Sequence, residues 1–172
     1  MVSKLSDQAE QFFQQVLETV MVAIPVDQNH PSVKADIELN EETGTFVGEF
    51  KFPLAYGATK VSDRTFLANG YSDLFSIVIR YEMCSNRNRS FLAVEKSKFE
   101  LRVHTAPGIR FEYERHKENV AAAHIHYTGV AGIISPALMK NFGEKKGNVQ
   151  DLHIPVGGHR FRPSLEDFCI SL

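Results

Sequence analysis

Apolar residues at the start of the chain recur every three or four positions from Leu5 to Ile24, with glutamine and acidic residues between them. This spacing places the apolar side chains on one face of an α-helix. Asp7 and Glu10 have the spacing of a capping box, Ser6 is an alternative cap, and Pro25 cannot continue the helix. The pattern therefore predicts an N-terminal amphipathic helix that packs on the core.

From residue 34 the apolar period changes to two. Residues 34–39 and 46–52 alternate on either side of a Glu-Glu-Thr-Gly segment, which is typical of a β-hairpin. Residues 55–73 are rich in glycine, asparagine and small polar residues, and this composition predicts an irregular crossover with room for one helical turn. An apolar segment at residues 74–83 predicts the next strand.

The alternating pattern continues through the middle of the chain. A second hairpin is predicted at residues 85–89, leading into a strand at residues 91–94. Between Val94 and Phe99 the apolar positions change from even to odd numbers, which requires a bulge or a bend near Ser97. We also expect a turn at Pro107-Gly108, followed by strands at residues 109–115 and 120–127.

Two helices are predicted in the last part of the chain. Ser135-Pro136 resembles an N-cap followed by proline at the first helical position, so residues 137–142 are expected to be a short helix, with a surface loop at residues 143–148. Pro163 is expected to open the last helix, with Glu166 and Asp167 in its first turn, where acidic groups favour the helix dipole.

These elements together predict an α+β fold. Strands follow one another without helices long enough to alternate as crossovers, which favours an antiparallel meander of about six strands. The N-terminal helix, the short helix and the C-terminal helix are expected to pack on one sheet face and to leave the other partly open. A length of 172 residues with 43% hydrophobic residues predicts one globular domain, residues 1–172.

The overall charge gives no reason to expect general binding to nucleic acid or to membranes. The formal net charge is −2 and the pI is about 6.4, so an anionic ligand would have to be held by a local set of basic residues. Acidic residues and glutamines interrupt the N-terminal segment, which argues against a signal peptide and predicts a cytoplasmic protein without a membrane span.

Two cysteines, Cys84 and Cys169, lie in apolar stretches and lack Cys-x-x-Cys spacing. Buried free thiols are therefore expected, in preference to a disulfide or a zinc site. Sequence patterns of serine and cysteine hydrolases are also absent, since there is no Gly-x-Ser-x-Gly segment and neither cysteine has a histidine nearby in the sequence.

Six of the seven histidines lie between His104 and His159. On a strand, His124 and His126 point to the same face because side chains alternate. Arg110 and Glu112 likewise share a face, so pairing of the two strands would bring all four side chains onto the open face of the sheet.

This set could perform acid–base chemistry. A carboxylate from Glu112 beside the imidazole of His124 or His126 can fix its tautomer and raise its basicity, and Arg110 can bind a phosphate or carboxylate. The alternative is a solvated sheet face with cross-strand charge pairs. The two histidines and Glu112 could also share a metal ion, but no His-Glu-x-x-His segment or thiolate pair is present, and no metal or other cofactor is expected.

A second basic segment precedes the last helix. Gly157 and Gly158 form a turn that leads to Arg160 and Arg162 near the predicted helix start. Backbone N–H groups at a helix N-terminus, together with arginine side chains, can bind an anion. The alternative is a turn that docks the last helix while the arginines remain solvated.

Three segments carry a family resemblance: Arg-Phe-Glu-Tyr-Glu at residues 110–114, Ala-His-Ile-His at residues 123–126, and the segment from Leu152 to Phe168 that includes Pro-Val-Gly-Gly-His-Arg-Phe-Arg-Pro. Together they resemble a family of actinobacterial and prophage proteins. That family in turn resembles the toxin partner of two-gene loci whose other gene joins a helix-turn-helix domain to a zinc-peptidase-like domain, the Rosmer-type arrangement. Members often carry a polar residue, usually Gln, where this chain has Ile125, so the resemblance leaves open whether both imidazoles are needed.

The resemblance implies a toxin of a bacterial toxin–antitoxin pair, neutralised by a protein antitoxin of the helix-turn-helix/peptidase type. The resemblance implies no catalytic residues, and the residues themselves suggest that the toxin acts through the polar sheet face on RNA or a nucleotide, with Arg110 and Arg162 holding phosphate and His124 or His126 moving a proton. The alternative is a non-catalytic module that binds a small ligand or a protein. A subunit role, with a sheet edge used to form a homodimer, is a third interpretation.

Overall fold

A computed structural model describes residues 4–26, 30–62, 65–117, 121–128, 152–156 and 162–172. Helix α1 spans Leu5–Ala23 and buries Ala9, Phe13 and Val20 among other residues of one face, as predicted. The predicted capping box is wrong, because the helix begins after Lys4 without a side-chain cap. The Ser6 N–H instead donates to Glu41 Oε1, 3.0 Å away, beyond the first hairpin strand.

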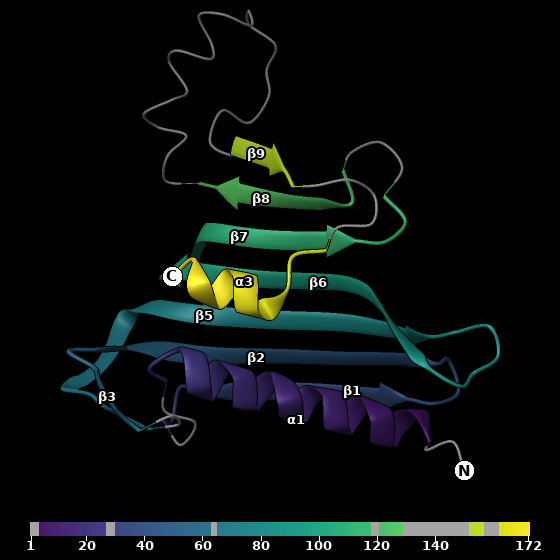
Figure 1. Ribbon diagram of the computed structural model, residues 1–172, viewed down its shortest axis with the longest axis horizontal. Helices are drawn as coiled ribbons and strands as arrows, with labels where there is room; N and C mark the ends of the chain where they lie inside the picture. The colour runs from purple at the N-terminus through teal and green to yellow at the C-terminus, as the bar shows by residue number, and fades with distance from the viewer. Residues whose placement is uncertain (1–3, 27–29, 63–64, 118–120, 129–151, 157–161) are drawn as a thin grey trace, which may run out of the picture.

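In the described part of the chain, seven strands form one antiparallel sheet with the order β1-β2-β5-β6-β7-β8-β9 (Figure 1). The fold is therefore α+β, with an antiparallel meander, as predicted, and strand β9 is one that the sequence pattern did not indicate. The strands are β1 (Lys34–Asn40), β2 (Thr45–Tyr56), β5 (Gly70–Ser85), β6 (Leu92–Val103), β7 (Ala106–Glu114), β8 (Ala123–Tyr127) and β9 (Leu152–Pro155).

The predicted irregular crossover at residues 55–73 is wrong. Strand β2 continues to Tyr56 and β5 begins at Gly70. Between them, β3 (Thr59–Ser62) and β4 (Thr65–Leu67) pair as a separate two-stranded sheet. Small polar residues are compatible with short strands when a partner strand is adjacent, so local composition was misleading here.

Two irregularities shape the central strands. Glu82 pairs with Lys96 and Met83 with Val94, so Glu95 is the extra residue that changes the apolar parity. The predicted bulge is confirmed in this interval. The predicted turn at Pro107-Gly108 is wrong, because β6 and β7 are joined three residues earlier, at a turn in which His104 has a φ of 56°. The two residues instead lie inside β7, next to a register shift.

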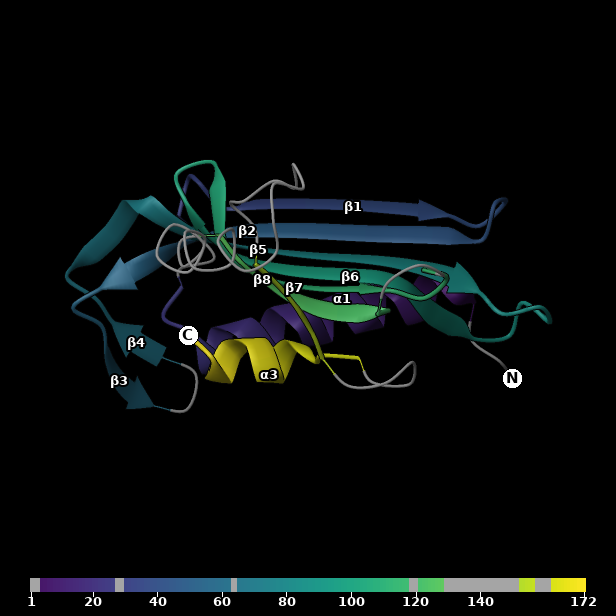
Figure 2. The ribbon, with the colours of Figure 1, turned by 90° about the horizontal axis from the view of Figure 1, so that it is seen from above.

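Helices α1 and α3 (Leu165–Ile170) lie on the same face of the sheet (Figure 2). Ser164 caps α3 in a capping box with Asp167, one residue after the proline that was expected to open it. Phe168 is buried, and its ring centroid lies 5.9 Å from that of Phe99 and 5.5 Å from that of Phe111. The two helices therefore cover an aromatic core and leave the charged residues of the strands on the other face.

Other predictions concern parts that the structure does not describe or does not test. The short helix at residues 137–142 and the loop at residues 143–148 lie outside the described residues. None of the helices in the described part of the chain combines the length and apolar character needed to span a membrane. A cytoplasmic location, one domain over residues 1–172, and a homodimer formed through a sheet edge stay predictions.

Replacing Gly48 by alanine is expected to destabilise the fold, because the added Cβ would lie 2.5 Å from Cε1 of Phe13 under α1. Overpacking of this kind costs about 1–3 kcal/mol. Gly108→Ala is the matched control, since its nearest neighbour would be the Leu101 carbonyl oxygen at 3.4 Å. Its effect should stay within about 0.5 kcal/mol. Urea unfolding of the three proteins checks this, and equal midpoints would contradict the packing of Phe13 on Gly48.

Candidate functional site

The register between β7 and β8 brings four predicted site residues together. Glu112 lies opposite His124, and Arg110 lies opposite His126. Side chains at these positions point away from the helices, because Phe111 between them is buried in the core. The structure therefore assembles these four side chains on the face where the sequence pattern placed them.

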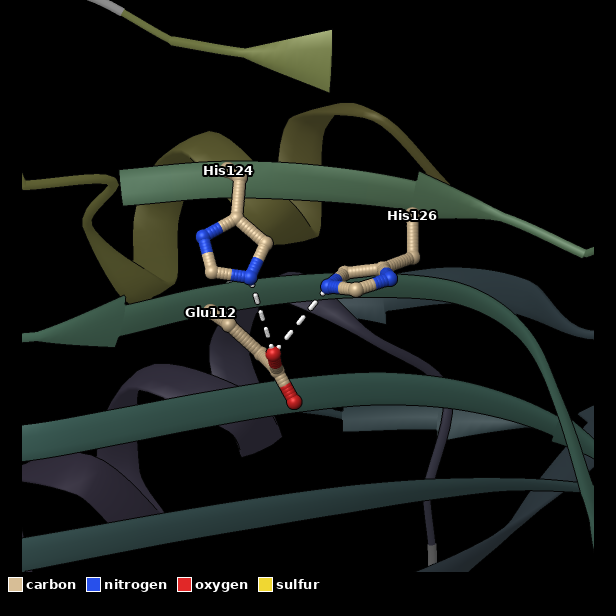
Figure 3. A group of neighbouring side chains, drawn as sticks. All are labelled: Glu112, His124 and His126. Atoms are coloured by element: carbon tan, nitrogen blue, oxygen red, sulfur yellow. Dashed lines mark hydrogen bonds and ion pairs between the residues drawn. The ribbon is translucent and has the colours of Figure 1, made fainter. Parts of the chain in front are cut away.

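The carboxylate of Glu112 is the centre of this cluster (Figure 3). Its Oε2 atom lies 3.1 Å from Nε2 of His124 and 3.1 Å from Nε2 of His126. The two imidazole rings are tilted to each other, with centroids 4.6 Å apart. One oxygen atom thus contacts both imidazoles, and we call Glu112, His124 and His126 the Glu-His-His cluster.

Arg110 fixes the orientation of the cluster through contacts with Glu112 and His126. Its Nε atom lies 3.0 Å from Glu112 Oε1, and its Nη2 atom lies 3.1 Å from His126 Nδ1. A guanidinium can only donate hydrogen bonds, so His126 Nδ1 accepts and the ring proton sits on Nε2, where it faces Glu112. Arg110 therefore selects one tautomer of His126.

The imidazoles are buried even though they lie on the sheet face opposite α1 and α3. His124 is 5% exposed and His126 is 2% exposed, whereas the Glu112 side chain retains 25% of its surface. The alternative interpretation was a solvated sheet face with cross-strand charge pairs. The side chains do pair across the strands, but a solvated face would leave the imidazoles exposed. Buried polar groups need partners, and the cluster with Arg110 supplies them.

Sequence reasoning missed Glu100, which lies on β6 opposite Arg110. It is 2% exposed, and its Oε2 atom lies 2.6 Å from both Nε and Nη2 of Arg102. Its Oε1 atom lies 3.8 Å from Lys98 Nζ and 3.9 Å from Arg110 Nη1. Glu100 thus ties Arg110 to a second ion-pair group, and pairing the sequences of β6 and β7 could have indicated it.

A pocket of about 160 Å³ opens on this face, and we call it the polar-face pocket. Glu112 and His124 line it, whereas Arg110 and His126 are not among its lining residues. Its wall also holds four cationic and two further acidic side chains: Arg80, Lys96, Lys98 and Lys117, with Glu82 and Glu114. Within the cluster, Glu112 and His124 are therefore the residues that a molecule in the pocket would meet.

Of the second predicted anion site, the structure describes Arg162. Gly157, Gly158 and Arg160 lie outside the described residues. Arg162 is exposed, with its guanidinium carbon 5.9 Å from the centroid of the Tyr113 ring. Tyr113 follows Glu112 on the strand and points to the opposite face, so Arg162 and Arg110 do not act on one bound phosphate.

The cysteines do not provide an activated nucleophile. Both are free, as predicted, but each is only partly buried. Burial raises the pKa of the Cys169 thiol to about 11. The pKa of Cys84 is also raised, first by burial and then by a hydrogen bond that its thiol donates to Glu95. A thiol with a raised pKa is protonated near neutral pH and is a poor nucleophile.

Among the described residues, the Glu-His-His cluster is a set of metal-ligating groups whose candidate ligand atoms all lie within 4.8 Å of one another. No protein-family model, curated protein or solved structure matches the chain. The site therefore has to be interpreted from its own geometry, and the family resemblance stays a prediction.

Replacing Glu100 by glutamine is expected to destabilise the protein by about 3 kcal/mol, because the buried carboxylate is lost while Arg102 and Arg110 keep their charges. Glu114→Gln is the control, since Glu114 pairs with Lys96 at 3.2 Å in a more exposed position. That variant should lose less than about 1 kcal/mol. Thermal and urea unfolding at neutral pH measure both effects, and similar losses would refute a special role for the buried pair.

Proposed function

We propose that the protein is the toxin of a bacterial toxin–antitoxin pair and that it acts on RNA or on a nucleotide in the polar-face pocket. The pocket carries the chemical half of this proposal, because it joins Glu112 and His124 to four cationic side chains. Phosphate-containing substrates need positive charge to hold them and a reactive group beside the scissile bond. The biological half rests on the family resemblance of the last third of the chain.

Within this proposal, the roles of the site residues differ from those expected from the sequence. Arg110 is engaged with Glu112, His126 and Glu100, so it acts as a positioning residue. Phosphate binding falls instead to pocket cations such as Lys98. Glu112 combines exposure to the pocket with three positioned neighbours, which favours it as the group at which the chemistry takes place.

Induction of the gene in a bacterial host tests the biological half. The wild-type chain is expected to arrest growth, and Glu112→Gln is expected to abolish the arrest because it removes the anionic oxygen at the centre of the cluster. His116→Ala is the control, since the His116 side chain is 76% exposed and lies outside the pocket lining. Co-expression with a helix-turn-helix/peptidase protein from the same locus should restore growth.

A growth arrest that persists in the Glu112→Gln strain, or no arrest by the wild-type chain, would contradict the proposal. For the chemical half, purified protein is incubated with total RNA and with single nucleotides. The rate at which the protein consumes RNA or a nucleotide should fall by at least about 100-fold in Glu112→Gln, because this is a typical contribution of one acid–base group. Circular dichroism of each variant confirms that the fold is retained.

A groove on the helix side favours the second candidate function, a non-catalytic binding module. It has a volume of about 790 Å³ and lies between α1 and α3, with Val16, Tyr81 and Leu165 among its lining residues. Val22→Glu and Ile170→Glu would place charge in this groove without touching the polar face. If these variants abolish growth arrest and Glu112→Gln does not, the binding interpretation replaces the catalytic one.

A further inference from the structure

The Glu-His-His cluster combines ligand types that bind transition metals. Nε2 of His124, Nε2 of His126 and Oε2 of Glu112 converge from two adjacent strands (Figure 3). Two imidazoles and one carboxylate form a donor set found around zinc and other first-row divalent cations. Calcium and magnesium prefer oxygen ligands alone, so this set favours a transition metal.

We propose that Glu112, His124 and His126 bind one divalent first-row transition cation, of which Zn²⁺ is the representative. The strands hold the three residues in fixed register, and both imidazoles are almost fully buried. Such a site loses little side-chain freedom when a cation binds, because the rotamers are already restricted by packing.

The movement needed to bind a cation is small. The three ligand atoms lie within 4.8 Å of one another. In a tetrahedral site, two ligands at about 2.1 Å from the same ion are about 3.4 Å apart. The most distant pair therefore has to approach by at most about 1.4 Å, which side-chain rotation within the existing backbone can supply.

Arg110 opposes the cation in two ways. Its positive charge lies beside the cluster, and its Nη2 atom donates to Nδ1 of His126. Coordination through Nε2 of His126 requires the ring proton on Nδ1, where it would face the guanidinium. Arg110 must therefore release His126 when the cation binds, while its contact with Glu112 Oε1, at 3.0 Å, can remain.

Three protein ligands leave at least one coordination position for water or substrate, as in catalytic zinc sites. Glu112 and His124 line the polar-face pocket, so this position would be reached from the pocket. Under the proposed function, on which this step alone rests, the cation would lower the pKa of a bound water and polarise a phosphate oxygen.

Metal binding is measured on the full chain after treatment with a chelator. Isothermal titration with Zn²⁺ is expected to show one site, and Co²⁺ should produce visible absorption bands typical of nitrogen and oxygen ligands. His124→Ala, His126→Ala and Glu112→Gln should each weaken binding at least about 100-fold, since each removes a direct ligand. His116→Ala should bind like the wild type.

Arg110→Met is the complementary variant. It removes the hydrogen-bond donor and the positive charge that compete with the cation, and it leaves the three proposed metal ligands in the sequence. It should bind Zn²⁺ at least about 10-fold more tightly, the scale of effects from residues next to metal ligands. Binding no tighter than about 100 μM in the wild type, or equal binding in the ligand variants, would overturn the metal site. Unchanged binding by Arg110→Met would overturn its proposed competition. If a variant fails to fold, the Co²⁺ spectrum of the wild type still tests the metal site, because it reports whether nitrogen and oxygen ligands bind the cation.

The outcomes also separate this inference from the proposed function. Tight Zn²⁺ binding without activity on RNA or nucleotides would leave the metal site standing and remove the proposed function. Activity that persists in excess chelator, in a chain that binds no Zn²⁺, would support the proposed function and remove the metal site. Activity lost in chelator and restored by Zn²⁺ would support both.

Discussion

Alternation of side chains along the strands is the constraint on which the rest of the structure depends. The sheet must bury one face, and α1 and α3 cover that face with an aromatic core that includes Phe13, Phe99 and Phe168. Every residue of opposite parity in the central strands is then directed to the other face. The concentration of charge on that face follows from the packing of the first.

Part of this charge is removed from water. Glu100, His124 and His126 are almost fully buried on the sheet face opposite α1 and α3, and Arg102, Arg110 and Glu112 supply their partners. Buried ion pairs contribute little net stability compared with apolar side chains of similar size, because desolvation offsets the attraction between charges. A buried charged network in the middle of a sheet therefore favours a role in ligand or substrate chemistry over one in stability alone.

The charged residues of the polar face differ in their access to the pocket. Glu112 and His124 line the pocket, His126 and Arg110 lie behind them, and Glu100 holds Arg110 from the next strand. Arg110 keeps His126 in the tautomer that donates to Glu112, so the same contacts that hold the cluster together also compete with a metal ion. In the proposed metal site, Arg110 is therefore the residue that competes with the cation for His126.

The sequence by itself determined which residues share a face. Period-three and period-two patterns located α1 and most strands, and parity placed Arg110, Glu112, His124 and His126 on one side, since parity follows from backbone geometry alone. It did not indicate β9 or the β3–β4 pair, whose strands are short and depend on a neighbour. The burial of the imidazoles and the separation of Arg162 from the cluster were decided only by the tertiary structure, because each depends on strand pairing and on helix packing between segments distant in the chain.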